Sequence, residues 1–99
     1  MKNIIKVDAD LAALMPVYLR NRREELVRIQ ALLEAGDMGA LQVIGHKMHG
    51  SGGGYGLDLL TDLGARMESS AQAGDKAALT AQAAEMKVFL DSVEIQFVP

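Results

Sequence analysis

Two histidines, His46 and His49, are the residues of this chain best suited to chemistry. The chain has no cysteine, so disulfide bonds, thiolate metal ligands and thiol nucleophiles are excluded. An ordinary histidine ring is mostly neutral at pH 7, and its unprotonated nitrogen can act as a nucleophile. Such a ring can attack phosphorus and later give the phosphoryl group to a carboxylate. This chemistry requires a ring that the fold leaves exposed.

The segment 37–51 is predicted to form a helix that carries both histidines. Leu41, Ile44 and Met48 recur at spacings of three and four, which is typical of a core stripe. Because successive helical residues turn by about 100°, His46 lies about 200° from Ile44 and from Met48 and points away from the core. His49 lies closer to the stripe. The residues that share the face of His46 are Gln42, His49, Gly50 and Gly53.

Apolar periodicity and Gly-Asp pairs divide the rest of the chain into further helices. Gly36-Asp37 and Gly74-Asp75 each place a helix-ending glycine before a capping aspartate. Pro16 suits a first helical turn. The expected elements are a short helix over about 8–15 and longer helices over about 16–35, 37–51, 56–73 and 75–97.

Each long segment carries one apolar stripe, which predicts an all-α fold. The last stripe is the clearest and comprises Leu79, Ala83, Met86, Leu90, Val93 and Phe97. Arg22 interrupts the stripe of segment 16–35, and the sequence alone does not explain it. Four long helices with short loops pack naturally as an antiparallel four-helix bundle, here with a short additional N-terminal helix. The 99 residues suit one domain, residues 1–99.

Composition and motifs argue against several classes of function. The net charge of −3 provides no basic stripe for nucleic acid. No run approaches the roughly 18 apolar residues of a membrane span, and the start of the chain is unlike a signal peptide, so we expect a cytoplasmic protein. No spare apolar stripe is evident, which favours a monomer. The two histidines lack a third ligand for a metal site. The glycines at 52–54 lack the lysine of a phosphate-binding loop, which argues against nucleotide binding and kinase activity.

The run His46-Lys47-Met48-His49-Gly50-Ser51, followed by Gly56 and the pair Met67-Glu68, resembles the signature of histidine-containing phosphotransfer domains. The resemblance extends from about residue 8 to residue 93. It implies a four-helix bundle in which His46 is the phosphoacceptor of a phosphorelay.

The same resemblance implies the partner, which is the receiver domain of a response regulator or hybrid histidine kinase. The receiver would supply an aspartate and a magnesium ion, so no cofactor is expected on this chain. His49, Gly50 and Ser51 would support the reaction. The expected docking surface comprises Gln42, Val43, His49, Gly50 and Gly53.

The chain departs from the family pattern at His49, where the family usually has lysine. Because lysine can assist the phosphoryl group with its charge, phosphotransfer here could be slower or more dependent on pH. Two other functions stay open: a helical bundle that docks a signalling partner without phosphotransfer, and a purely structural bundle. Acid-labile phosphorylation of a single histidine would distinguish phosphotransfer from both.

Overall fold

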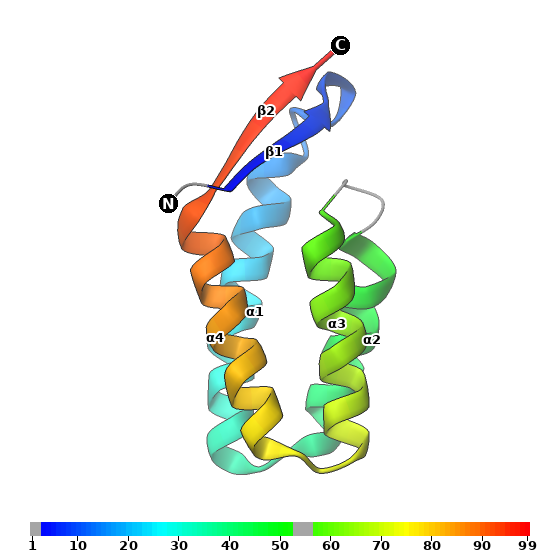
Figure 1. Cartoon of the computed structure of the whole chain (residues 1–99), viewed down its shortest axis with the longest axis vertical. Coiled ribbons are helices and arrows are strands. Elements are labelled where there is room, and N and C mark those ends of the chain that lie inside the picture. The colour runs from blue at the N-terminus through cyan, green and yellow to red at the C-terminus, as the bar shows by residue number, and fades with distance from the viewer. Residues whose placement is uncertain (1–2, 53–56) are drawn as a thin grey trace.

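A computed structural model describes residues 3–52 and 57–99 of the chain. The described part contains four α-helices, each packed against the next, with the last returning to the first (Figure 1). The predicted antiparallel four-helix bundle is therefore confirmed. The elements in chain order are β1 (Asn3–Asp8), the 3-10 turn η1 (Ala9–Leu11), α1 (Met15–Ala35), α2 (Met38–Gly52), α3 (Asp58–Gln72), α4 (Lys76–Ser92) and β2 (Val93–Val98).

The bundle core is formed by the stripes that periodicity predicts. Each helix contributes at least one side chain with no exposed surface, and these include Ile29, Leu41, Leu63 and Leu79. Ile44 is partly buried and packs against this cluster. Burial of one apolar face per helix supplies the main stabilisation of such a bundle.

The Gly-Asp pairs end and begin helices as predicted. Gly36 and Gly74 adopt the left-handed conformation, with φ of 70° and 68°. The side-chain oxygens of Asp37 and Asp75 each accept a hydrogen bond from the backbone N–H three residues later, at 3.1 and 3.0 Å. These caps fix the two turns at one end of the bundle (Figure 1).

The prediction that the last helix continues to Phe97 is wrong, because α4 ends at Ser92 and the chain continues as a strand. Val93 and Phe97 are four residues apart, and this spacing places two side chains on one face of a helix and also on one face of a strand. Ile95 distinguishes the two patterns. It is partly buried against the core, as an alternating strand requires.

The short N-terminal helix over 8–15 is also absent. Asp8 ends a strand rich in β-branched residues, and its side chain accepts a hydrogen bond from the Asp10 N–H to start only a 3-10 turn. The fold is therefore a helical bundle with a two-stranded sheet, and it is not purely α-helical.

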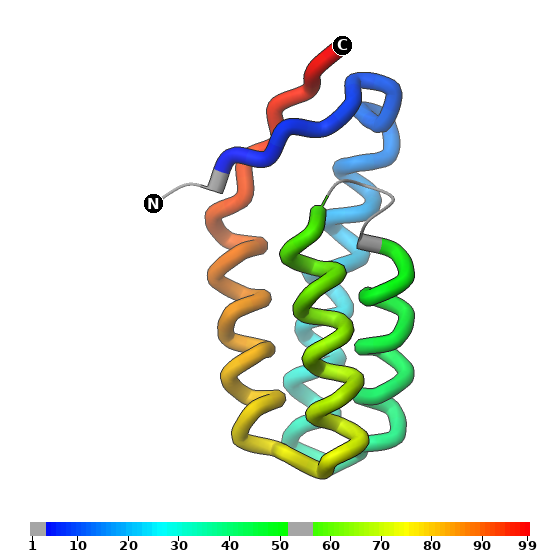
Figure 2. The backbone as a smooth tube through the Cα atoms, turned by 45° about the vertical axis from the view of Figure 1, so that its right-hand side comes forward, coloured from blue at the N-terminus to red at the C-terminus, as the bar shows by residue number. Residues whose placement is uncertain are grey.

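The two strands pair in parallel over six residues and form a ribbon beyond one end of the bundle (Figures 1 and 2). Ile5 lies opposite Ile95, and Val7 opposite Phe97. Val7 is only 3% exposed, whereas Phe97 is 43% exposed. One face of the ribbon thus closes the end of the core.

Helices α2 and α3 approach each other closely at two buried glycines. A Cβ added to Gly45 would lie 2.7 Å from the backbone nitrogen of Glu68 and 2.9 Å from the carbonyl oxygen of Gly64. A Cβ added to Gly64 would in turn clash with the backbone at Met48 and His49. Only glycine at both positions allows the two backbones this separation.

Arg22, which interrupts the apolar stripe of α1, joins α1 to the end of α2. Its guanidinium lies over the ring of Tyr18, 5.0 Å from the ring centroid. Its Nε lies 3.3 Å from a carboxylate oxygen of Glu25, and its other side donates to Ser51 Oγ at 3.3 Å. The side chains of Arg22 and Glu25 are only 16% and 7% exposed, so the pair is part of the packed interior.

Gly45→Ala should destabilise the protein by about 1–3 kcal/mol, because the new methyl group must push α3 away from α2. Gly50→Ala, on the same helix, is the matched control. A Cβ at Gly50 meets nothing within 4 Å, so this change should stabilise the protein by about 0.5–1 kcal/mol. Denaturant unfolding of both variants measures the difference. Equal effects of the two substitutions would contradict the close helix approach.

Glu25→Gln should become more stable relative to the parent as the pH rises from about 4 to about 7. Burial raises the pKa of Glu25 above its ordinary value of 4.5, against the opposing effects of Arg22, Arg28 and Lys47. The folded state therefore holds this proton more tightly than the unfolded chain. Its stabilising contribution is complete below the unfolded pKa and is lost as the pH rises through the folded pKa.

Free energies of unfolding across this pH range measure the effect. Glu24→Gln, at an exposed position of the same helix, controls for the loss of one negative charge. A constant difference between the parent and Glu25→Gln would contradict the raised pKa.

Candidate functional site

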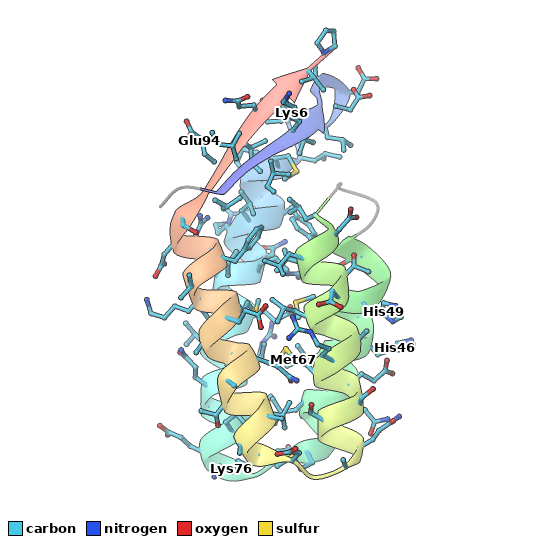
Figure 3. The ribbon with its side chains drawn as sticks, viewed as in Figure 1. Lys6, His46, His49, Met67, Lys76 and Glu94 are labelled. Carbon is cyan, nitrogen blue, oxygen red and sulfur yellow. The ribbon has the colours of Figure 1, made fainter. Side chains whose placement is uncertain are left out.

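His46 projects from the middle of α2 into solvent, as its position in the helix predicts (Figure 3). Its side chain is 73% exposed. Its ring nitrogen Nδ1 lies 2.9 Å from carboxylate oxygen Oε2 of Glu68, which is on α3 and has a side chain 24% exposed. The site thus combines an accessible imidazole with a partly buried carboxylate from the neighbouring helix.

This contact determines which nitrogen of a neutral His46 ring carries the proton. An ionised carboxylate can only accept hydrogen bonds, so Nδ1 must carry the proton that Glu68 accepts. The unprotonated nitrogen of the ring is then Nε2, whose lone pair is available to an electrophile. A positive charge that develops on the ring is stabilised by the adjacent carboxylate.

The close approach of α2 and α3 brings Glu68 to His46. Gly45 precedes His46 directly, and Gly64 lies one helical turn before Glu68. The sequence identifies Glu68 only as part of a pair that resembles the family, and the contact between its side chain and His46 was not predicted. The two glycines, each inside a helix where alanine is preferred, are the signal that could have indicated this contact.

His49 lies one helical turn after His46 on the same side of α2 (Figure 3). It is exposed and belongs to the last turn of the helix, where a cationic side chain is favoured by the helix dipole. A phosphoryl group on His46 would therefore have a second imidazole beside it.

The predicted docking face around His46 is open where the structure describes it. Gly50 is exposed, Val43 is 53% exposed and Gln42 is half-buried. Gly53, the remaining residue of this face, lies outside the described residues. A partner could approach His46 without displacing a side chain at Gly50.

Ser51 faces a different direction from His46. Its hydroxyl accepts a hydrogen bond from Arg22 on α1 and lies 3.5 Å from the carbonyl oxygen of Met48, to which it donates. Ser51 therefore holds the end of α2 against α1.

A groove of about 390 Å³ between α1 and α2 lies next to the docking face. Val43 belongs to both surfaces. Leu32 and Ile44 give the groove an apolar lining, while Arg28 and Lys47 contribute positive charges. The groove thus combines an apolar lining with two positive charges and the carboxylate of Glu25.

The structure gives no indication of a metal site in residues 3–52 and 57–99, where no three His, Cys, Asp or Glu side chains gather closely enough to hold an ion. None of the helices in these residues is sufficiently long and apolar to span a membrane.

Comparison with known proteins gives one result. The Hpt domain family model matches residues 13–95, a range that includes all four helices and excludes β1. No curated protein and no solved structure matches the chain. Hpt domains are phosphotransfer carriers of two-component signalling and are not kinases. The exposed His46 lies within the matched residues, and the chain belongs to the Hpt domain family.

Proposed function

We propose that this protein is a phosphorelay intermediate that carries a phosphoryl group on His46 and exchanges it with the aspartate of receiver domains. The observation that carries the proposal is the contact between Nδ1 of the exposed His46 and the carboxylate of Glu68. A purely structural bundle does not require an exposed imidazole whose Nδ1 is held by a carboxylate of the neighbouring helix. Membership of the Hpt domain family supports the same role.

The reaction follows from the protonation pattern of His46. Its Nε2 lone pair attacks the phosphorus of the receiver's aspartyl phosphate. The P–Nε2 bond forms, the P–O bond to the aspartate breaks, and the carboxylate leaves. The Nδ1 proton stays on the ring, and Glu68 offsets the positive charge that the ring gains. The reverse reaction returns the phosphoryl group to a receiver. Magnesium belongs to the receiver in this scheme, which takes place in the cytoplasm.

The docking surface proposed for the receiver comprises Val43, His49 and Gly50 around His46, together with the groove between α1 and α2. Arg28 and Lys47 at this groove provide positive charge for the acidic active site of a receiver. Val43 provides an exposed apolar contact at the junction of the two surfaces.

His46→Gln should abolish phosphorylation by a phosphorylated receiver domain, and Glu68→Ala should slow it. A hydrogen bond to a charged group contributes about 1.5–3 kcal/mol, which corresponds to a rate lower by about 10- to 100-fold. Transfer of radiolabelled phosphate, followed by mass mapping of the modified residue, measures both effects. His49→Gln is the control for the identity of the acceptor, since it removes the neighbouring imidazole and leaves His46 intact.

Label on the parent and on His49→Gln, but not on His46→Gln, is the expected pattern. No label on any folded variant with several receivers would contradict phosphotransfer and favour a module that only binds its partner. Label on His46 at an unchanged rate in Glu68→Ala would retain the function and remove the proposed role of Glu68.

His49→Lys should make the rate of phosphotransfer less dependent on pH. Histidine gains its charge only in mildly acidic solution, whereas lysine is charged throughout this range. Transfer rates at about pH 6 and about pH 8 for the parent and the variant measure the effect. Identical pH profiles would show that His49 does not assist the phosphoryl group.

A further inference from the structure

The ribbon of β1 and β2 has an unpaired edge along β2. In the described residues each strand pairs only with the other, so each has one free edge. The C-terminal half of β2 lies farther from the helices than β1 does in both views of the backbone (Figures 1 and 2). Gln96, Phe97 and Val98 are all exposed there, the last two by 43% and 36%.

A parallel ribbon of this kind gains stability from a further strand. Parallel pairing is slightly weaker per residue than antiparallel pairing, and parallel strands normally occur in larger, covered sheets. Two strands alone are marginal in water. Here one face is covered by the bundle through Val7, while the free edge of β2 leaves backbone donors and acceptors for another chain.

The two edges differ in their protection against such pairing. The β1 strand carries Lys6 at its centre and Asp8 at its end, and charged residues on an edge strand oppose association. In β2 the only charge is Glu94, and the run from Ile95 to Val98 is uncharged. The unprotected edge therefore belongs to β2.

We propose that β2 pairs with β2 of a second copy of this chain, antiparallel across a twofold axis, to form a four-stranded sheet. In the register we assign, Gln96 lies opposite the partner's Gln96. Ile95 then lies opposite the partner's Phe97 on the face that covers the bundle, and Glu94 lies opposite the partner's Val98 on the outer face. This arrangement places no like charges opposite each other and covers the exposed ring of Phe97.

Symmetry favours the same edge. Pairing of β2 with β2 is isologous and closes after two copies, whereas pairing of β2 with β1 of a second copy leaves free edges and continues into a filament. An equivalent dimer through β1, centred on Lys6, would place two lysines directly opposite each other, which is unfavourable. The sequence-based expectation of a monomer considered only helix stripes, and the edge of β2 was hidden within the expected last helix.

The proposed dimer leaves phosphotransfer unobstructed. His46 lies on α2 at mid-height of the bundle, and the ribbon extends beyond one end (Figure 3). Both histidines of a dimer would remain accessible to receiver domains. The dimer is therefore independent of the proposed function, and either can fail without the other.

The chain has no cysteine, so a single introduced cysteine reports the pairing register. Gln96→Cys places two thiols opposite each other on the outer face, where Cα atoms about 5 Å apart suit a disulfide. Lys6→Cys is the matched control, since Lys6 lies directly opposite Gln96 within the ribbon and is also exposed. In the proposed sheet the two Lys6 positions are three strand spacings apart, about 14 Å, which is too far for a disulfide.

We expect rapid oxidation of Gln96→Cys to a covalent dimer and slow, collision-limited oxidation of Lys6→Cys. Sedimentation of the parent should give twice the chain mass of 10.6 kDa. Gln96→Lys places two lysines opposite each other at the twofold axis, so this variant should sediment as a monomer of about 10.6 kDa. A parent that sediments at 10.6 kDa, or equal oxidation rates of the two cysteine variants, would overturn the proposal. Phosphorylation of His46 in Gln96→Lys should match the parent in all cases.

Discussion

The backbones of α2 and α3 meet at Gly45 and Gly64, and the geometry of the site depends on this contact. Any side chain at either position would separate the helices, since an added Cβ at Gly45 would lie 2.7 Å from backbone of α3. His46 directly follows one glycine and Glu68 lies one turn after the other. The contact therefore places a carboxylate beside the ring that would react.

The rest of the fold holds these two helices in place while it leaves His46 exposed. The Gly-Asp caps fix the turns at one end of the bundle. At the other end, Arg22 ties the last turn of α2 to α1 through Ser51. His46 thus lies on a helix that is anchored at both ends, and its exposed ring is accessible without unfolding any element.

Helical periodicity was sufficient to predict the bundle, its core and the outward direction of His46, because each of these depends on the position of a residue along one helix. The C-terminal strand was missed because the spacing of Val93 and Phe97 fits both a helix and a strand. The contact between His46 and Glu68 was missed for a different reason. It depends on the separation of two helices, which two small residues set and which a stripe of apolar residues does not reveal.

The most direct test of this account is the identity of the ring nitrogen that carries the phosphoryl group. Protein labelled with ¹⁵N in its histidines can be phosphorylated by a receiver domain, and phosphorus–nitrogen couplings then identify the bonded nitrogen of His46. Because Glu68 accepts the hydrogen bond from Nδ1, we expect a bond from phosphorus to Nε2. A phosphoryl group on Nδ1 would contradict it, since that nitrogen could not have kept its contact with Glu68 during the attack.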